Sequence, residues 1–342
     1  MTDQPMTAPL QIDTRDDVLQ DVLEIDRQAS VWMKRGMALA RDGAAPALEE
    51  ALACFQEAIA LRGRIPLDTF PAYRYGLAAC WLNRGEALAA LGGAQRLERA
   101  IEAYDIALSL LVQLPIEHDP RVRRRLAIAW QNKGLALQAQ GHIDEPDGGA
   151  LQAFQRATDL IDDEAVLIDD RDYMRAAICT NLANAFLAID DGDAATTARG
   201  LAHRVIELTA NRTEDSLDLS VVAITARHVL CQAITRLLIV RDNAASRDFV
   251  RELVNEATDA VDDGLSIARR WEQRGVDRLR GLAYDLVRFG ARVYATYQPQ
   301  FLSEFVQENF DPARSSGHYV GSVEMRAAAI DSLWLSFRAH RP

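Results

Sequence analysis

A tryptophan-centred segment recurs in the first half of this chain at a fixed spacing of 49 residues. In each copy a glycine stands four residues after the tryptophan, and an alanine and then an aromatic residue follow further along. The recurring positions are Trp32, Gly36 and Phe55, then Trp81, Gly85 and Tyr104, then Trp130, Gly134 and Phe154. Self-similarity at a period of about 20 to 50 residues is typical of repeat proteins, in which each unit buries its apolar face against the next. We therefore expect a stack of helix pairs.

The order Trp, Gly, Ala and aromatic resembles the tetratricopeptide repeat (TPR) family, whose units span about 34 residues. Two departures stand out. The position before the glycine, a leucine in the family, is a cation here, and the 49-residue period is about 15 residues longer. The resemblance implies an all-α, right-handed superhelical solenoid of antiparallel helix pairs. The longer period predicts helices longer than those of the family. The three cations are Arg35, Arg84 and Lys133.

The match weakens along the chain without losing its period. Small residues continue the glycine column at Asn184, Ala233 and Gly290, whereas the tryptophan column changes to Thr180, Val229 and Leu286. We expect four TPR-like pairs over 13–210, divergent helical repeats over 211–297, a helical cap over 298–342 and a disordered tail at 1–12. A last helix at 323–339, which carries Trp334, would cover the open end of the stack. A homodimer contact through this C-terminal helix is the alternative.

Proline and glycine indicate where helices begin and end. Asp119-Pro120 is a favourable helix start, and Gly92-Gly93 is a favourable stop. The expected helices are 14–41, 46–63, 71–91, 95–114, 120–140, 148–161, 170–190, 194–210, 215–241, 244–270, 275–297 and 300–309. Glycine inside a helix costs about 1 kcal/mol relative to alanine. We therefore interpret the glycine column as a place where two helices approach closely, and the tryptophan and Phe/Tyr columns as core.

Composition narrows the possible functions. A net charge of −12, from 38 basic and 50 acidic side chains, argues against nucleic acid as a partner. No run of 18 uninterrupted apolar residues predicts a membrane span. The four cysteines form no Cys-x-x-Cys pair and lie in apolar patterns, so we expect buried, reduced thiols and a cytoplasmic protein. Histidines at metal-ligand spacing are absent from the sequence, and we expect neither a metal nor another cofactor.

Two positions of each first helix are candidates for contact with a partner. In the TPR family the position two residues after the tryptophan lines the concave groove, and the position five residues before it lies on the same helical face. Asn, Lys and Arg side chains there would suit peptide carbonyls and carboxylates. An ordinary solvated face with surface ion pairs is the alternative. The candidate groove residues are Arg27, Lys34, Asn83, Arg125, Asn132 and Arg175.

The leading functional hypothesis is a non-catalytic scaffold or adaptor that binds a peptide or helix of another protein in its concave groove. The carboxylate clamp of some family members is not reproduced, because Met33 and Met37 occupy groove positions. A peptide-sensing cytosolic regulator is the second hypothesis. The third is an enzyme with an unrecognised site in 215–310. The sequence contains no phosphate-binding glycine loop, no Gly-x-Ser-x-Gly and no His-Glu-x-x-His.

Overall fold

The computed structural model describes residues 14–117, 119–146, 148–162, 170–241 and 246–310. Within these residues every regular element is an α-helix, and inside each of the two units described below successive helices pack on one another, which confirms the all-α, helix-pair prediction. The chain divides into two compact units between Gln140 and Gly141. We call them the N-terminal and the C-terminal unit and describe each by itself. The predicted tail at 1–12 and the predicted helix at 323–339, with Trp334, lie outside the described residues.

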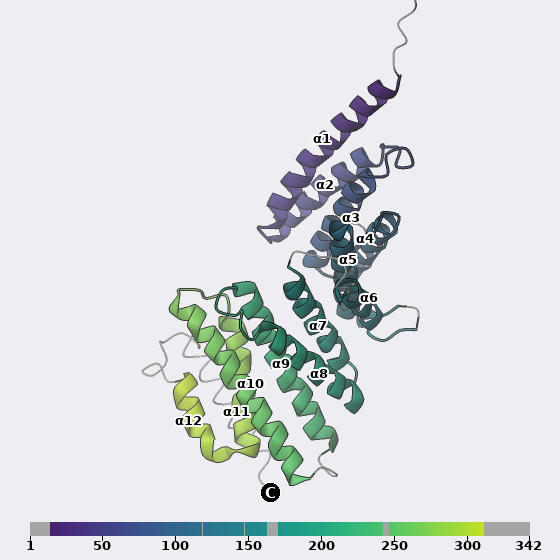
Figure 1. The fold of residues 1–342 in the computed structure, drawn as a ribbon. Helices are drawn as coiled ribbons and strands as arrows, with labels where there is room; N and C mark the ends of the chain where they lie inside the picture. Colours follow the sequence, from purple (N-terminus) through teal and green to yellow (C-terminus); the bar gives the residue numbers. More distant parts are fainter. Residues whose placement is uncertain (1–13, 118, 147, 163–169, 242–245, 311–342) are drawn as a thin grey trace, which may run out of the picture. The chain divides into compact units, whose positions relative to one another are not determined.

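The described part of the N-terminal unit has five helices. Each packs against the next (Figure 1). The first helix of each pair also contacts the first helix of the next pair: α1 contacts α3, and α3 contacts α5. With 19 residues in α3 and 18 in α4, the helices are long, as the extended period predicts. The helices are α1 (Thr14–Ala40), α2 (Ala45–Arg62), α3 (Tyr73–Leu91), α4 (Ala94–Leu111) and α5 (Pro120–Gln140).

Local sequence signals place the ends of α3 and α5. Helix α5 begins at Pro120, and the backbone N–H of Arg121 donates to the Asp119 carboxylate at 2.9 Å. Helix α3 stops before Gly92 and Gly93, which have φ angles of +66° and +86°. L-residues other than glycine rarely adopt such angles, so the turn into α4 depends on this glycine pair.

The glycine column is where the two helices of a pair meet. A Cβ atom on Gly36 would lie 2.6 Å from Cε1 of Phe55, and one on Gly85 would lie 2.5 Å from Cε1 of Tyr104. Both aromatic side chains are fully buried. The small residue thus makes room for the ring of the second helix, which confirms the interpretation of the column as a close approach.

The tryptophans are less buried than their repeat suggests. Trp32, Trp81 and Trp130 are all half-buried, whereas Phe55, Tyr104 and Phe154 are fully enclosed. The cation three residues after each tryptophan lies over its ring, at 5.8 Å for Arg35, 5.2 Å for Arg84 and 5.5 Å for Lys133. These distances are typical of cation–π contacts. They explain why a cation can replace the leucine of the TPR pattern: it covers the exposed face of the indole.

The C-terminal unit is built around α9, which contacts α7, α8, α10 and α11. Ile224, Leu230 and Ile234 of this helix are almost completely buried. Figure 1 shows α9, α10 and α11 running side by side. The helices are α6 (Ala150–Asp162), α7 (Arg171–Leu187), α8 (Gly192–Thr209), α9 (Leu217–Arg241), α10 (Arg247–Gln273), α11 (Arg280–Tyr297) and α12 (Pro299–Phe310).

Within the described residues, one helical segment, Leu217–Val240 of α9, is long and apolar enough to cross a membrane by length and composition. Two thirds of its most apolar window is buried by the surrounding helices. A central core helix meets the same criteria, because it must be apolar on almost every side. The burial of α9 within this unit accounts for its apolar composition.

Candidate functional site

The six predicted groove residues are divided between the two units. Five lie in the N-terminal unit, whereas Arg175 lies in α7 of the C-terminal unit. Two of the six are exposed on α1: Lys34 lies at the surface, and the guanidinium of Arg27 bonds Glu24 of the same helix at 2.6 Å. Such an exposed ion pair within one helix contributes little to stability, because water screens it.

The other N-terminal candidates contact neighbouring helices or their own backbone. Asn83 donates to the carbonyl of Ala79 in its own helix at 2.7 Å. Asn132 donates to the Glu86 carboxylate at 2.8 Å and so links α5 to α3. The Arg125 guanidinium lies 4.3 Å from the centre of the Tyr75 ring, again between α5 and α3. Asn132 and Arg125 therefore face the junction between α3 and α5.

A small cavity of about 310 Å³ lies beside the Asn132–Glu86 hydrogen bond. Its walls are mostly apolar and come from α3, α4 and α5, with Leu97 and Leu135 among them. Burial raises the pKa of the Glu86 carboxyl above its usual value, although the hydrogen bond from Asn132 and the charge of Arg125 act in the opposite direction. Asn132 is thus the predicted groove residue that borders a cavity in this unit.

Gly76 interrupts the series of cations at the position five residues before each tryptophan. A Cβ atom there would lie 3.1 Å from Cζ of Arg62, whose guanidinium occupies this space from α2. Arg62 is 7% exposed and donates to the Asp26 carboxylate at 2.9 Å, to the Gly76 carbonyl at 2.9 Å and to Ser30 Oγ at 3.1 Å. The side chain thus ties α2 to both α1 and α3. No repeat signal marks Arg62, so sequence reasoning missed it.

In the C-terminal unit the predicted residue Arg175 is also engaged. Its Nε lies 2.7 Å from an oxygen of Asp162, and Arg204 of α8 bonds the other oxygen of that carboxylate at 2.9 Å. The Arg175 side chain is only 16% exposed, so this ion pair is largely shielded from water. Arg175 therefore holds α7 to α6 rather than projecting freely toward solvent.

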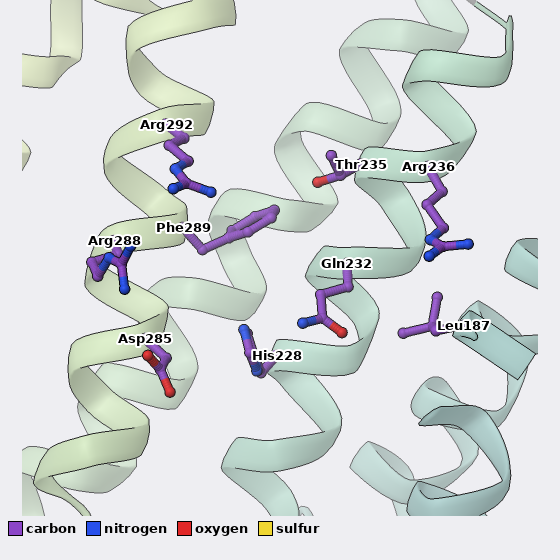
Figure 2. A pocket seen from close by; sticks show the side chains of 9 residues that line it. All are labelled: Leu187, His228, Gln232, Thr235, Arg236, Asp285, Arg288, Phe289 and Arg292. Carbon is purple, nitrogen blue, oxygen red and sulfur yellow. The ribbon is translucent and has the colours of Figure 1, made fainter. Parts of the chain in front are cut away.

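A pocket of about 430 Å³ in the C-terminal unit lies between helices α7, α9 and α11. Figure 2 shows Phe289 projecting from α11 toward α9, with Arg288 and Arg292 on the α11 side and Arg236 near Leu187 on the other. We call it the arginine pocket. It is lined by Leu187, His228, Gln232, Thr235, Arg236, Asp285, Arg288, Phe289 and Arg292.

The three arginines of this pocket are not equally engaged. Arg236 donates to the carbonyl of Ile189 at 2.8 Å, with Asp190 at 3.7 Å. Arg288 is exposed and lies 5.8 Å from the Tyr284 ring. Arg292 is exposed, and among the described residues its guanidinium has neither a hydrogen bond nor an ion pair. Two cations one helical turn apart on α11 are therefore available to a ligand.

His228, Thr235 and Gln232 add hydrogen-bonding groups to the arginine pocket but no further charge at pH 7. Burial lowers the pKa of the His228 imidazole, and the carboxylate of Asp285 only partly offsets this effect. His228 is therefore neutral at pH 7. Thr235 donates its hydroxyl to the carbonyl of Cys231 at 3.0 Å, which leaves its oxygen as an acceptor. Gln232 is exposed at the pocket and can both donate and accept.

A second cleft of about 480 Å³ lies between α8, α9 and α10, and its positively charged residues are paired with carboxylates of the cleft. Glu256 of α10 accepts from Arg199 Nε and from His203 Nε2, both at 2.8 Å. Burial raises the pKa of the Glu256 carboxyl, but the hydrogen bonds and charges of Arg199 and His203 outweigh it and hold the pKa below its usual value. The network ties α8 to α10, so we assign it a structural role.

Sequence reasoning missed the arginine pocket because the tryptophan column ends before it. Carried to the fifth unit, the position two residues after that column is Cys231, which is fully buried. Carried to the sixth unit, the same position is Arg288. The helical phase therefore points to one pocket residue once the register is known. The side chains from α9, among them Gln232 and Arg236, become apparent only from the packing of the helices.

The four cysteines are free and buried, as the sequence predicts. In the part of the chain that the structure describes, no group of three or more His, Cys, Asp and Glu side chains is placed to hold a metal ion.

Comparison with known proteins gives a structural likeness but no relative by sequence. No protein-family model matches the chain. No curated protein matches it in sequence either. Among solved structures, the fold is similar to a protein from Podosopora anserina described as a kinesin light chain with nearly identical TPR-like repeats. The TM-score is 0.46 and the sequence identity 16%, over 68% of this chain and 95% of that one.

Proposed function

We propose that this protein is a non-catalytic interaction scaffold that binds a peptide or helix of a partner protein in grooves between the first helices of its pairs. Helix-pair repeats present long surfaces to partners, and stacked repeats suit this role better than they suit chemistry. The observation that carries the proposal is the arginine pocket. It combines exposed Arg288 and Arg292 with half-buried Phe289. Arginine and aromatic side chains are the groups most enriched at the energetic centres of interfaces.

The N-terminal unit supports the proposal with a second, smaller site. Its cavity has apolar walls and one amide–carboxylate pair, Asn132 and Glu86, which can bond a peptide backbone. In contrast, Asn83 and Arg125 already contact their own unit, so we assign them a lesser part in binding. The proposed partner is a protein rather than a nucleic acid, since the chain carries a net charge of −12.

A peptide-sensing cytosolic regulator is the second candidate. It uses the same pocket, but binding would change a contact with another protein. The proposed compartment is the cytoplasm, where buried reduced thiols such as Cys179 and Cys231 are the ordinary state. The two candidates differ in output: a scaffold holds its partner irrespective of a third molecule, whereas a regulator changes affinity for a second partner when the peptide is present.

The test is an array of 15-residue peptides that contains basic, neutral, acidic and phosphorylated sets, probed with the full chain. We expect a subset to bind, and the double variant Arg288→Ala/Arg292→Ala to lose at least tenfold in affinity for that subset. The matched control is Arg247→Ala/Arg251→Ala, which removes two exposed arginines at the same spacing from α10. Thermal melts check that both variants remain folded. Equal binding by both variants would move the interaction surface elsewhere.

A further inference from the structure

The residues that line the arginine pocket carry more positive than negative charge. Three guanidinium groups, from Arg236, Arg288 and Arg292, face one carboxylate, from Asp285. His228 adds no charge at pH 7 because burial lowers its pKa. The residues that line the pocket therefore carry a net charge of +2, in a chain whose overall charge is −12. Such a local reversal of sign focuses the electric field on anionic ligands.

The excess charge is concentrated on α11. Arg236 donates to the Ile189 carbonyl and has Asp190 at 3.7 Å, so part of its charge is already balanced. Arg288 and Arg292 are four residues apart, which places their Cβ atoms about 5 to 6 Å from each other on one helical face. Both are exposed, and neither is in an ion pair among the described residues. Two guanidinium forks can therefore converge on one ligand group.

We propose that the arginine pocket binds a phosphorylated side chain in an extended segment of the partner protein. This inference rests on the proposed function and specifies the chemistry of the partner at this site. Arg288 and Arg292 bond the phosphoryl oxygens from the α11 side, and Arg236 supplies a third positive charge. Phe289 and Leu187 provide apolar surface for residues beside the phosphorylated position.

Charge and geometry favour a phosphoryl group over a single carboxylate. A phosphorylated side chain carries a charge of about −1.5 to −2 at pH 7 and has three acceptor oxygens. Its charge can balance Arg288 and Arg292 together, whereas one carboxylate can balance only one of them. Guanidinium groups bind phosphate through paired N–H donors, and two such forks offer more donors than a carboxylate can accept. Gln232 can donate an additional hydrogen bond.

The test uses synthetic 15-residue peptides with a central phosphoserine between random flanking residues. Each is matched with the same sequence carrying serine or glutamate. Binding to the full chain is measured by fluorescence anisotropy at a fixed ionic strength. We expect the best phosphopeptides to bind at least tenfold more tightly than their serine versions, and the glutamate versions to fall between the two. Arg288→Ala and Arg292→Ala should each reduce the phosphopeptide preference, and Arg247→Ala should leave it unchanged.

A variant that removes a negative charge from the pocket should have the opposite effect on phosphopeptide binding. Asp285→Asn removes the one carboxylate that lines the pocket, so phosphopeptide binding should become several-fold tighter while binding of the serine versions stays the same. The variant Arg288→Lys keeps the charge but loses the planar fork, and we expect it to bind more weakly than wild type. Asp248→Asn, on the exposed surface of α10, is the matched control for the charge change.

The outcomes separate this inference from the proposed function. If serine and phosphoserine peptides bind equally well and both need Arg288 and Arg292, the peptide groove stands and the phosphoryl preference is wrong. If no peptide in any set binds above background, both proposals fail. If inorganic phosphate competes at the same concentration as the best phosphopeptide, the pocket binds a free anion rather than a partner segment, and the inference is overturned.

Discussion

The two units of this chain achieve helix packing by different means. In the N-terminal unit a glycine on one helix receives an aromatic ring from the next, as in the pair Gly85 and Tyr104, and a cation lies over each half-buried indole. In the C-terminal unit the core is mainly aliphatic and centres on α9, with buried polar ties such as Trp271 Nε1 to Ser220 Oγ at 2.8 Å.

The glycine–aromatic contact nevertheless returns at the end of the C-terminal unit. A Cβ atom on Gly290 would lie 2.7 Å from Cζ of Phe305, in the pair α11 and α12. Leu286 stands at the tryptophan position of this pair. The contact between a small residue and a large ring can therefore occur without the tryptophan of the repeat signature. Close approach of paired helices needs complementary volumes, not particular residues.

The largest expected effect comes from removing a ring in the N-terminal unit. Phe55→Ala should lower the free energy of unfolding by about 3 to 5 kcal/mol, because it leaves a cavity beside Gly36. Trp81→Ala should cost less, since the indole is only half-buried. Urea denaturation followed by circular dichroism measures both, and hydrogen exchange shows where protection is lost. A larger loss for Trp81→Ala than for Phe55→Ala would contradict the assignment of the core.

The stabilisation from the contacts of Glu256 with Arg199 and His203 in the C-terminal unit should depend on pH. Glu256→Gln should cost about 1 to 3 kcal/mol at pH 7, because Arg199 loses its charged partner. The folded pKa of Glu256 lies below its usual value of 4.5, so its stabilisation is present above that pH and is lost as pH falls through the folded pKa. Denaturation at pH 7 and at pH 3 should therefore show a smaller difference between variant and wild type in acid. An unchanged difference would exclude this linkage.

Alanine replacement of two helical glycines should give opposite signs. Gly85→Ala adds a Cβ against Tyr104 and should destabilise by about 1 to 3 kcal/mol, which exceeds the gain in helix propensity. Gly200 in α8 has no heavy atom within 4 Å of such a Cβ, so Gly200→Ala should stabilise by about 0.5 to 1 kcal/mol. Thermal and urea unfolding measure both. If both variants were stabilised, the close contact at Gly85 would be unimportant.

The smallest expected effect concerns the cations over the tryptophans. Arg84→Ala should reduce stability by about 0.5 to 1 kcal/mol, because it uncovers the ring of Trp81. Arg64→Ala, which removes an exposed arginine from the segment after α2, is the control and should be nearly neutral. Parallel urea titrations compare the two. Equal and negligible effects would mean that Arg84 replaces the leucine of the TPR pattern without contributing to packing.

Much of the fold was accessible from sequence because its signals are local. Helix α5 begins and ends where Pro120 and its apolar period predict, and α3 stops at its glycine pair. Predictions became less accurate for α10, which was expected over 244–270 and spans Arg247–Gln273. Its start depends on the hydroxyl of Ser246, which accepts from the N–H of Phe249 at 3.2 Å, and Gly275 with φ +80° follows its end. Other residues in this part of the sequence could equally have been read as the start or the end of α10.

The candidate site was less accessible. The sequence indicated a helical phase, and that phase does bring Asn132 to Glu86 and Arg125 to Tyr75. It could not indicate which polar side chains already have internal partners, because those partners come from other helices. Arg175 was predicted to face a groove, yet its guanidinium pairs with Asp162.

The sequence by itself determined the helix-pair architecture, its period and the small–aromatic contacts, because glycine, proline and apolar spacing act within one or two turns of helix. Only the tertiary structure decided where a usable site lies. Arg288 and Arg292 share a pocket with Arg236 because α9 and α11 pack together, although 52 residues of sequence separate Arg236 from Arg288. The net charge and the free donors of such a site depend on which groups packing brings together, and a one-dimensional pattern does not specify them.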